Sequence, residues 1–311
     1  MAGAEYDIVI AGGGVAGLSA GLTAARLGRT THVLTGPALG GHLISIERID
    51  GYPGFPDGIP GYDLGPIIQE QAVGAGAEFS ASEATALRAD DGRWRVSTSE
   101  GDLLARTLVI ATGTTLKTLG IPGEEEFRGK GISHCASCDA PLLRNRVVGV
   151  IGGGDSALQE ALTLAQHAAR VVIFHRGADF SAQSAYIQQV QQNPKIEVRF
   201  GTVVEEAIGN GGLKSVRTRS AGDGKTDEIE LAGLFVYVGL APATALLDGV
   251  LALDASGRVP VDGGMRSSLT GLLAAGTVRS GSAGRAASAA GDGATAALSA
   301  DRYLRDGTWS A

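Results

Sequence analysis

Cysteine is scarce in this chain: two occur among 311 residues, and both fall in the segment 131–139, as Cys135 and Cys138. A zinc site made of four thiolates is therefore excluded, because no further cysteine exists to complete it. The close spacing favours redox use, in which the two thiols form and open a disulfide. Two alternatives stay open, a mixed metal site with some of the five histidines and an inert pair of buried thiols. We expect no metal.

Positive charge is also in short supply. The chain has 26 Lys and Arg against 33 Asp and Glu, a formal net charge of −7, and the cations are scattered along it. A protein that tracks a phosphate backbone needs a basic stripe or patch. We therefore expect neither a nucleic acid nor an anionic membrane surface as a partner.

Membrane-directing segments are lacking as well. The uncharged stretch 231–247 is interrupted by Gly233, Gly239 and Pro242 and is shorter than a bilayer span. No basic region precedes an apolar run at the start of the chain, so we expect no signal peptide and a cytoplasmic location.

Glycine, in contrast, is abundant, with 48 residues, and it marks an internal repeat. Strands are predicted at 6–11 and 147–151, and each runs into a glycine-rich turn followed by a helical pattern. Thr35 and His175 close the next strand of each unit at matching distances. Two such units predict two dinucleotide-binding loops, because glycine allows the tight turn and the close approach of a pyrophosphate to a helix N-terminus. The loop residues are Gly12, Gly14 and Gly17 in the first unit, and Gly152, Gly154, Asp155, Ser156 and Ala157 in the second.

The rest of the chain fits around these units. The stretches 108–113 and 271–276 are predicted to be buried strands that end in glycine, and 84–104 alternates as a small antiparallel insertion. We predict an α/β fold with two Rossmann-like, three-layer ββα dinucleotide-binding domains, the second inserted in the first. The expected FAD-type domain is 1–116 with 246–311, and the second domain, which carries the cysteine pair, is 117–245.

The order of the motifs resembles the low-molecular-weight thioredoxin reductases over essentially the whole chain. Besides the two glycine loops, the likeness is carried by Gly40-Gly41, Tyr52-Pro53-Gly54-Phe55-Pro56, Ala111-Thr112-Gly113, Cys135-Ala136-Ser137-Cys138-Asp139 and His175-Arg176. The resemblance implies a flavoprotein oxidoreductase with FAD in the first domain, a nicotinamide dinucleotide in the second, and a homodimer. It also implies a domain rotation that presents the disulfide and the nicotinamide to the flavin in turn.

The resemblance implies a role for three catalytic residues. Cys138 is the thiol nearer the flavin, Cys135 is the outer thiol that attacks a partner disulfide, and Asp139 carries the proton. The partner implied is a thioredoxin-like protein or a small disulfide or dithiol. His134 directly precedes Cys135, but adjacency in sequence does not aim its ring at the sulfur, so a structural role is the simpler interpretation.

The resemblance also implies a set of FAD contacts. Four positions depart from the family, because His42, Gly51, Thr277 and Ala286 replace polar residues usually found near the flavin ring or ribityl chain. We therefore expect the flavin potential to differ from that of a standard reductase. The expected FAD-binding residues are Gly12, Gly14, Gly17, Thr35, Gly41, His42, Thr112, Gly113, Gly276, Thr277, Arg285, Ala286 and Ala287.

The second dinucleotide site departs further. NADPH-using members of the family hold the 2′-phosphate with arginines, and two of those positions are Gly177 and Ser181 here, with only Arg176 kept. Charge-assisted hydrogen bonds contribute about 1.5 to 3 kcal/mol each, so losing two weakens 2′-phosphate recognition by roughly a hundredfold or more. The acidic residue typical of an NAD site is absent too, since His175 and Arg176 occupy that position. The expected occupant is a second FAD, NADH or weakly bound NADPH.

Several functions fit this pattern. We favour a flavin-dependent dithiol–disulfide oxidoreductase without high-affinity NADPH, similar to pyridine-nucleotide-independent relatives that are ferredoxin-linked or carry two flavins. One alternative is an ordinary NAD(P)H-dependent thioredoxin reductase with relaxed specificity, and another is an FAD-dependent dithiol oxidase that uses oxygen. The Cys135, Cys138 and Asp139 unit argues against a non-enzymatic sensor or scaffold, which needs no proton donor beside a thiol pair.

Overall fold

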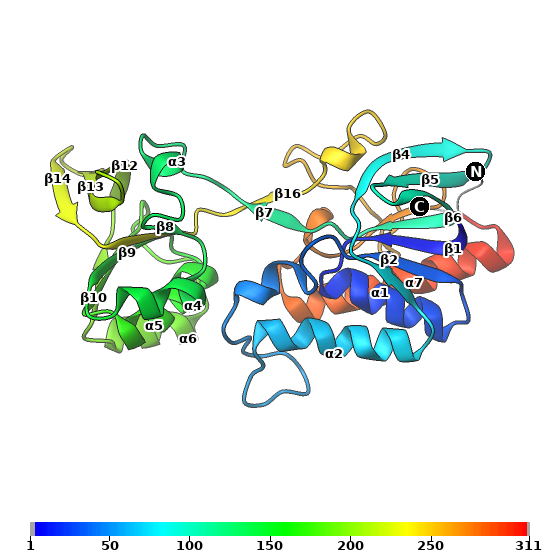
Figure 1. The fold of residues 1–311 in the computed structure, drawn as a ribbon, viewed down its shortest axis with the longest axis horizontal. Coiled ribbons are helices and arrows are strands. Elements are labelled where there is room, and N and C mark those ends of the chain that lie inside the picture. The colour runs from blue at the N-terminus through cyan, green and yellow to red at the C-terminus, as the bar shows by residue number, and fades with distance from the viewer. Residues whose placement is uncertain (1–3, 310–311) are drawn as a thin grey trace. The chain divides into compact units, whose positions relative to one another are not determined.

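A computed structural model describes residues 4–309, and the chain divides into two compact units (Figure 1). One unit is Met1–Thr115 with Ala241–Ala311, and the other is Leu116–Leu240. The chain therefore leaves the first unit once and returns to it once, so the second unit is an insertion. The strands at these two crossings, β7 (Thr114–Leu116) and β16 (Leu240–Pro242), pair with each other in a two-stranded sheet.

The first unit is built on a 7-stranded sheet with the order β3-β2-β1-β6-β5-β4, and β17 also pairs with β6. The strands around β1 are parallel, with Ile10 opposite Val33 on β2 and Val109 on β6. The predicted insertion at 84–104 is confirmed as an antiparallel pair, β4 with β5, which adds to the N-terminal part of β6. The strands are β1 (Ala4–Ala11), β2 (Thr31–Leu34), β3 (Glu78–Ser80), β4 (Ala84–Asp90), β5 (Arg93–Thr98), β6 (Gly101–Ile110) and β17 (Leu272–Ala274).

Helices α1, α2 and α7 lie along one side of the parallel strands of this sheet (Figure 1). Small residues let α1 and α7 pack closely: a Cβ on Gly293 of α7 would lie 2.0 Å from the carbonyl oxygen of Ala16 on α1. This contact brings the N-terminal parts of both helices next to the first glycine loop. The helices are α1 (Val15–Arg26), α2 (Gly61–Gly74) and α7 (Ala286–Asp306), with 3-10 turns η1 (Gly41–Ser45), η3 (Ala245–Leu247) and η4 (Gly276–Val278).

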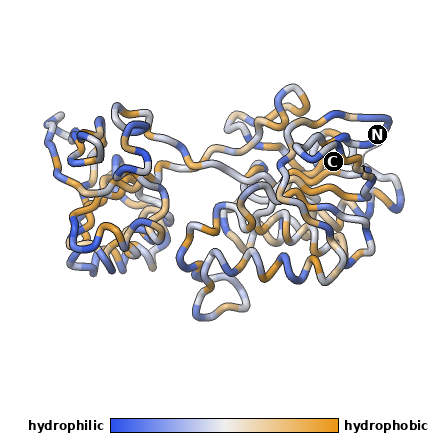
Figure 2. Tube along the Cα trace, viewed as in Figure 1, coloured by the Kyte–Doolittle hydropathy of each residue, from blue (hydrophilic) through white to orange (hydrophobic). Residues whose placement is uncertain are grey.

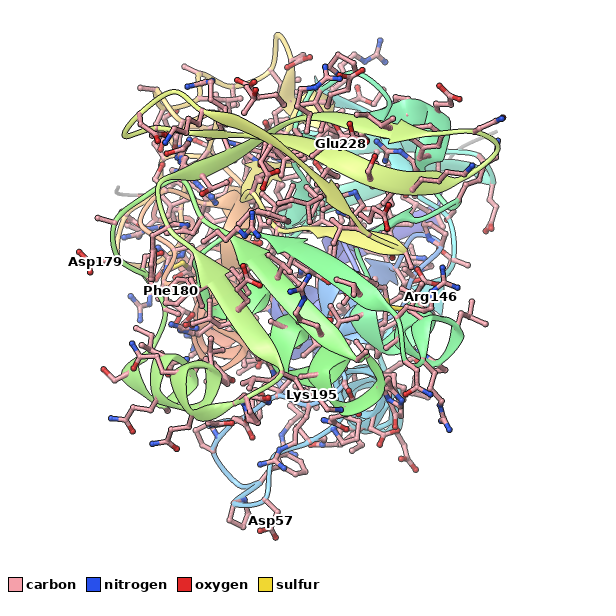
Figure 3. The ribbon with its side chains drawn as sticks, turned by 90° about the vertical axis from the view of Figure 1, so that its left-hand side faces the viewer. Asp57, Arg146, Asp179, Phe180, Lys195 and Glu228 are labelled. Carbon is pink, nitrogen blue, oxygen red and sulfur yellow. A yellow bond between two sulfur atoms is a disulfide. The ribbon has the colours of Figure 1, made fainter. Side chains whose placement is uncertain are left out.

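The second unit repeats the parallel arrangement with the order β11-β10-β9-β15-β8, and a 3-stranded antiparallel sheet, β12-β13-β14, accompanies it. Figure 3 faces this unit, with the parallel strands in the centre and helices beneath them. Lys195, labelled there, donates from Nζ to the carbonyl oxygens of Ala165 and Ala168, at 2.9 and 3.3 Å, and caps the end of α5. The strands are β8 (Ile132–Ser133), β9 (Val147–Ile151), β10 (Arg170–Phe174), β11 (Ile196–Arg199), β12 (Thr202–Gly209), β13 (Leu213–Ser220), β14 (Thr226–Glu230) and β15 (Gly233–Val236). The helices are α3 (Glu124–Phe127), α4 (Ala136–Asp139), η2 (Ala140–Leu143), α5 (Asp155–His167) and α6 (Ser184–Gln192).

Both units bury their central strands. Val148, Val150, Val171 and Ile173 of the second unit are fully buried, as are Ile8, Ile10 and Val109 of the first. Figure 2 shows the same division, with hydrophobic strands at the centre of each unit and hydrophilic loops around them. Over residues 4–309, no helix has the length and apolar character that a membrane span requires.

Candidate functional site

The first glycine loop connects β1 to α1 and has three different glycine environments. Gly12 has a φ of +125° and a Cβ there would lie 2.2 Å from the oxygen of Ala111, while a Cβ on Gly17 would lie 1.8 Å from the oxygen of Gly12. Side chains at these two positions would collide with backbone. Gly14 is different, because no atom lies within 4 Å of the Cβ it would carry. The loop thus leaves open space beside the N-terminus of α1, where a pyrophosphate fits.

A second glycine pair approaches this loop. The N–H of Gly40 donates to the oxygen of Gly13 at 2.9 Å, and a Cβ on Gly41, whose φ is +59°, would lie 3.2 Å from the Cα of Gly14. The 3-10 turn η1 follows directly and carries His42. Burial lowers the pKa of His42 and so favours the neutral form of its imidazole.

The ends of β6 and β17 complete the same face of the first unit. A Cβ on Gly113, at the end of β6, would lie 3.5 Å from Oγ1 of Thr277, and one on Gly276 would lie 2.9 Å from Cβ of Ala16. Thr112 donates from Oγ1 to the oxygen of Ala243 at 2.7 Å. The structure therefore brings Gly113, Gly276 and Thr277 together with the predicted residues of the first loop. We call this group of residues the FAD cradle.

The other predicted FAD residues lie at the edges of this cradle. Thr35 packs against the loop, since a Cβ on Gly13 would lie 2.7 Å from its Cβ, and its hydroxyl donates to backbone oxygens of Gly36 and Ser80. Arg285 is the N-cap residue of α7, and Ala286 and Ala287 form the first turn of that helix.

A buried ion pair that the sequence patterns did not indicate joins the η4 region to α7, next to the FAD cradle. Arg279 binds Asp292 of α7 through two bonds of 2.7 Å, from Nε and from Nη2. The N–H of Gly276 also donates to Asp292, at 3.1 Å. Asp292 is 6% exposed. A buried charge is tolerated when it is paired and hydrogen-bonded, so this ion pair can fix η4 to α7. The only sequence signal for the ion pair is an acidic residue among the alanines and glycines of 286–297.

In the second unit, Cys135 and Cys138 form a disulfide with an S–S distance of 2.07 Å. Cys135 is the N-cap of α4, and its Sγ accepts a hydrogen bond from the N–H of Cys138 at 3.3 Å. Asp139 closes the same turn, with its N–H donating to the oxygen of Cys135 at 3.3 Å. Cys138 is exposed, and Cys135 and Asp139 are half-buried. The predicted catalytic residues thus occupy one helical turn.

The residues before the disulfide are held to neighbouring strands. Ser133 accepts the N–H of Cys135 on its Oγ at 3.1 Å. His134 lies 2.9 Å from the oxygen of Val236 through Nδ1, so this nitrogen carries the proton and donates to β15. This contact favours the structural interpretation of His134.

The second glycine loop, between β9 and α5, has the same combination of crowded and open glycines as the first. Gly152 has a φ of +147°, and a Cβ there would lie 2.6 Å from the oxygen of Tyr237 and 2.7 Å from Cβ of Ala157. Gly154 again is open, since the nearest atom to a Cβ at this position is Oγ of Ser181 at 3.8 Å. Asp155 and Ser156 begin α5 directly after the loop. These residues repeat the open arrangement of the first loop, and we call them the second cradle.

The segment after β10 is fastened to this second loop. Ser181 donates its N–H to the oxygen of Gly153 at 2.9 Å, and Gln183 binds both oxygens of Asp155, from its N–H at 2.7 Å and from Nε2 at 3.0 Å. The ring of His175 covers the loop, because a Cβ on Gly153 would lie 2.3 Å from it. Arg176 is exposed. Ser181, which stands where the family pattern has an arginine, therefore holds this segment to the backbone of the loop.

Aromatic rings flank this segment. The ring of His175 lies 5.6 Å from Phe180 and 6.1 Å from Phe200, and Phe180 lies 4.9 Å from Phe200. Nε2 of His175 is 2.9 Å from the oxygen of Asp179, which fixes the ring orientation. Asp179 and Phe180 are labelled in Figure 3.

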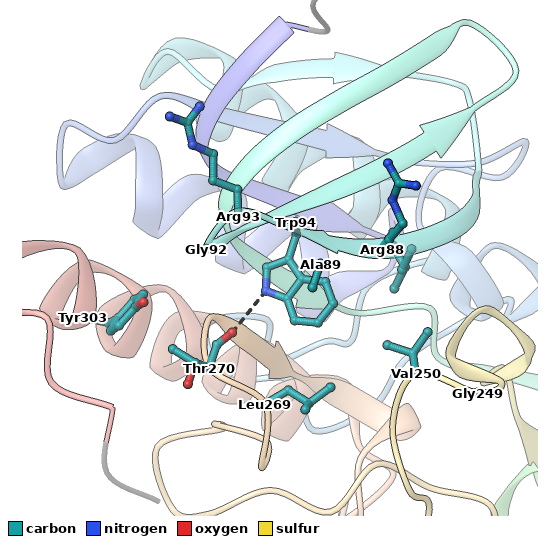
Figure 4. Close-up of a pocket in the computed structure, with 11 residues that line it drawn as sticks. Arg88, Ala89, Gly92, Arg93, Trp94, Gly249, Val250, Leu269, Thr270 and Tyr303 are labelled. Atoms are coloured by element: carbon teal, nitrogen blue, oxygen red, sulfur yellow. Dashed lines mark hydrogen bonds between the residues drawn. The ribbon is translucent and has the colours of Figure 1, made fainter.

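The first unit also contains a cavity of about 530 Å³ away from the glycine loop (Figure 4). It lies between β4, β5 and the segment before β17, and Nε1 of Trp94 donates to the oxygen of Thr270 at 3.2 Å beside it. Arg93 at its rim is already paired with Glu5 at 2.8 Å. No residue expected from the sequence to bind a cofactor lines this cavity.

Two Rossmann-type glycine loops and a disulfide in one chain are features of a flavin-dependent disulfide oxidoreductase. The model of the family "Pyridine nucleotide-disulphide oxidoreductase" matches residues 6–293. The thioredoxin reductase of Treponema pallidum (strain Nichols) is 37% identical over 96% of this chain and 97% of its own length. The NADPH-dependent thioredoxin reductase 3 of Arabidopsis thaliana is 38% identical over 96% of this chain and 58% of its own length. The crystal structure of Lactococcus lactis thioredoxin reductase, in a form designated FR conformation, has a TM-score of 0.94 and 33% identity over 97% of this chain and 99% of that chain.

The chain belongs to the thioredoxin reductase family of FAD-dependent disulfide oxidoreductases. The fold class predicted from sequence, two Rossmann-like domains of mixed α/β type with parallel sheets, is confirmed.

Proposed function

We propose that this enzyme passes electrons between FAD in the first unit and the Cys135–Cys138 disulfide, and from there to a disulfide of a thioredoxin-like protein or a small molecule. The observation that carries the proposal is the disulfide at the start of α4, in a chain with an open glycine cradle at Gly14. FAD supplies the chemistry of accepting and giving an electron pair. Its binding would rest on the Gly12–Gly17 loop, Gly41, Gly113 and the η4 turn.

The chain's own residues account for the exchange step. Cys135 attacks the partner disulfide as a thiolate, a mixed disulfide forms, and the displaced partner sulfur leaves as a thiolate that takes up a proton. Cys138 then attacks Cys135 and releases the second partner sulfur. The Cys138 N–H, already directed at Cys135 Sγ, stabilises the negative sulfur before attack, and Asp139 in the same turn would carry the proton.

The second cradle is proposed to bind a dinucleotide without a tight hold on a 2′-phosphate. Arg176 is the one arginine left of the expected set, and the hydroxyl of Ser181 donates to the backbone oxygen of Gly153 at 3.3 Å. We therefore propose that NADPH binds weakly at most, and that the donor is NADH, a second flavin or a ferredoxin-linked route. We also propose a homodimer located in the cytoplasm.

An ordinary NADPH-dependent thioredoxin reductase is the second candidate. It is favoured by the intact glycine loop around Gly154 and by the similarity to a plant relative named as NADPH-dependent. An FAD-dependent dithiol oxidase is a further outcome, recognised by rapid reoxidation of the reduced enzyme in air with formation of peroxide.

Anaerobic titration of the FAD-loaded enzyme with NADPH and with NADH separates the donors, with bleaching of the flavin band as the readout. We expect bleaching by NADPH to require at least tenfold more nucleotide than NADH, or to fail with both. Gly154→Ala serves as the matched control, because its Cβ would enter the second cradle while the FAD cradle stays intact. Fast bleaching at stoichiometric NADPH, lost in Gly154→Ala, would instead establish the ordinary reductase.

A further inference from the structure

A buried carboxylate binds the backbone of the turn that carries Cys135 and Cys138, which we call the redox turn. Glu160 lies on α5 and is 6% exposed. Its Oε2 accepts a hydrogen bond from the backbone N–H of Ala136 at 3.1 Å. Ala136 is fully buried and is the first residue of α4, directly after Cys135. A carboxylate on the helix of the second glycine loop therefore holds the first amide of the redox helix.

A tyrosine lies beside the same carboxylate. Tyr237 follows β15, and its N–H donates to the oxygen of Ile151 at 2.8 Å. Its phenol oxygen is buried without a hydrogen bond of good geometry. Burial is the main reason that the pKa of this phenol is raised, and the Glu160 carboxylate is the next. The Glu160 side chain and the Tyr237 phenol oxygen are thus both buried, and the charge of the carboxylate acts on the phenol.

Two acceptors share the N-terminal amides of α4. The N–H of Ala136 goes to Glu160, and the N–H of Cys138 goes to Sγ of Cys135. Free amides at the start of a helix stabilise a negative sulfur. Glu160 therefore removes one such amide from Cys135 and adds a carboxylate one residue away from it, and both effects disfavour a thiolate at Cys135.

The apolar surroundings make this carboxylate unusual. The buried face of α5 otherwise consists of alanine, leucine and threonine, and a buried carboxyl group is costly unless it is hydrogen-bonded. Two other titratable side chains belong to this segment. The charge of Asp139 on α4 also acts on Tyr237, and His134 donates to β15. Neither replaces Glu160 as the acceptor for Ala136.

We propose that Glu160 is a positioning residue that keeps the reduction potential of the Cys135–Cys138 couple low. This inference rests on the proposed function, in which the couple receives an electron pair from reduced FAD. Reduction breaks the S–S bond, takes up the electron pair and one proton, and leaves a Cys138 thiol and a Cys135 thiolate. By disfavouring that thiolate, Glu160 makes the reduced pair a stronger donor to the partner disulfide.

The test equilibrates the FAD-loaded enzyme anaerobically with mixtures of reduced and oxidised dithiothreitol, traps free thiols with a maleimide, and reads the mass. Glu160→Gln keeps an acceptor for the Ala136 N–H and removes the charge. We expect its disulfide to be reduced more readily, with the equilibrium constant shifted about tenfold, or about 30 mV for a two-electron couple. Iodoacetamide should also alkylate its Cys135 at lower pH.

Glu124→Gln is a matched control. Glu124 is 3% exposed in the same unit and accepts the N–H groups of Leu119 and Gly120 at 3.0 and 2.7 Å. Its substitution should lower the melting temperature and leave the dithiothreitol equilibrium unchanged. A merely structural role of Glu160 would give the same pattern.

Tyr237→Phe is a second control, because it leaves the Glu160 carboxylate and its bond to Ala136 in place. We expect the dithiothreitol equilibrium of this variant to stay within twofold of wild type, since the phenol oxygen has no hydrogen-bond partner to lose. An equilibrium constant within twofold of wild type for Glu160→Gln overturns the inference. Failure of the wild-type cysteines to exchange with dithiothreitol at all would instead overturn the proposed function.

Discussion

The backbone N–H of Cys138 donates to Sγ of Cys135 at 3.3 Å, so one redox sulfur is also the N-cap of the helix that holds the other. We expect this amide to stay directed at Cys135 when the disulfide opens and to favour the thiolate form of that sulfur. The same contact offers nothing comparable to Cys138. The two cysteines are therefore expected to differ in reactivity although they share one turn.

Their separate substitution should show this difference. Cys135→Ser should leave a flavin that can still be reduced but should abolish disulfide reductase activity, because the attacking thiolate is gone. Cys138→Ser should keep a reactive Cys135 and trap a stable mixed disulfide with a substrate thiol. Mass spectrometry of each variant after incubation with a small disulfide checks the assignment. A stable mixed disulfide on Cys135→Ser rather than on Cys138→Ser would reverse the inner and outer roles.

Two glycines of the first loop should fail in different ways. Gly17→Ala places a Cβ 1.8 Å from the oxygen of Gly12, so we expect a protein that does not fold or folds with a melting temperature many degrees lower. Gly14→Ala meets no atom within 4 Å and should fold normally. It should nevertheless bind FAD at least tenfold more weakly, because its methyl group enters the space left for the pyrophosphate.

Circular dichroism and the flavin absorbance per protein measure folding and FAD content separately. Gly28→Ala is not a suitable control, since Gly28 has a φ of +76°; Gly74→Ala at the end of α2 is, because nothing lies within 4 Å of its Cβ and its φ is not positive. Full FAD content in Gly14→Ala would show that the cofactor does not use this cradle.

Restoring the missing arginines should restore a hold on the 2′-phosphate. The double substitution of Gly177→Arg and Ser181→Arg should lower the NADPH concentration needed to bleach the flavin by roughly a hundredfold or more, at about 1.5 to 3 kcal/mol for each charge-assisted bond. The effect on NADH should be small. Because Ser181 also donates its side chain to the oxygen of Gly153 at 3.3 Å, Ser181→Ala is the control for the loss of that contact. Equal use of NADPH before and after the substitutions would contradict the proposed weak site.

His42 should make stability depend on pH. Burial lowers the pKa of His42, so below the unfolded-state value of about 6.5 the unfolded chain takes up a proton that the folded chain does not. Stability therefore falls as the pH drops below about 6.5, by up to about 1.4 kcal/mol per pH unit for one histidine. Burial lowers the pKa of His32 as well, so His42→Gln should remove only part of this dependence.

Thermal unfolding of wild type and His42→Gln at pH 8 and pH 5.5 tests the prediction. The difference in melting temperature between the two pH values should be smaller in the variant. An equal difference would show that His42 is free to take up a proton in the folded enzyme.

The overall architecture was predictable because it depends on local patterns. An apolar strand, a glycine turn and a helix follow one another at 6–26 and again at 147–167, and each run predicts a dinucleotide-binding unit. The alternation at 84–104 predicts an antiparallel pair of strands. The antiparallel sheet β12-β13-β14 was not predicted, although β13 alternates buried and exposed residues over much of its length.

The supporting contacts of the site could not be predicted. Glu160 and Ala136, or Arg279 and Asp292, meet only because the chain folds, and no periodic pattern states which amide a buried carboxylate will accept. A polar residue within an apolar helix face was the available signal at Glu160. The contact of Ser181 was similarly not predictable, because the sequence shows which residue stands at position 181 but not that its hydroxyl donates to the oxygen of Gly153.

The proposed electron path between FAD and the Cys135–Cys138 disulfide is tested most directly by an anaerobic titration of the FAD-loaded enzyme with dithionite. Wild type should take up about twice as many electrons per flavin as Cys138→Ser, because the disulfide accepts a second electron pair in the wild type alone. Maleimide trapping at the end point should find both cysteines reduced. Equal uptake by wild type and variant, with the disulfide still intact when the flavin is fully reduced, would contradict it.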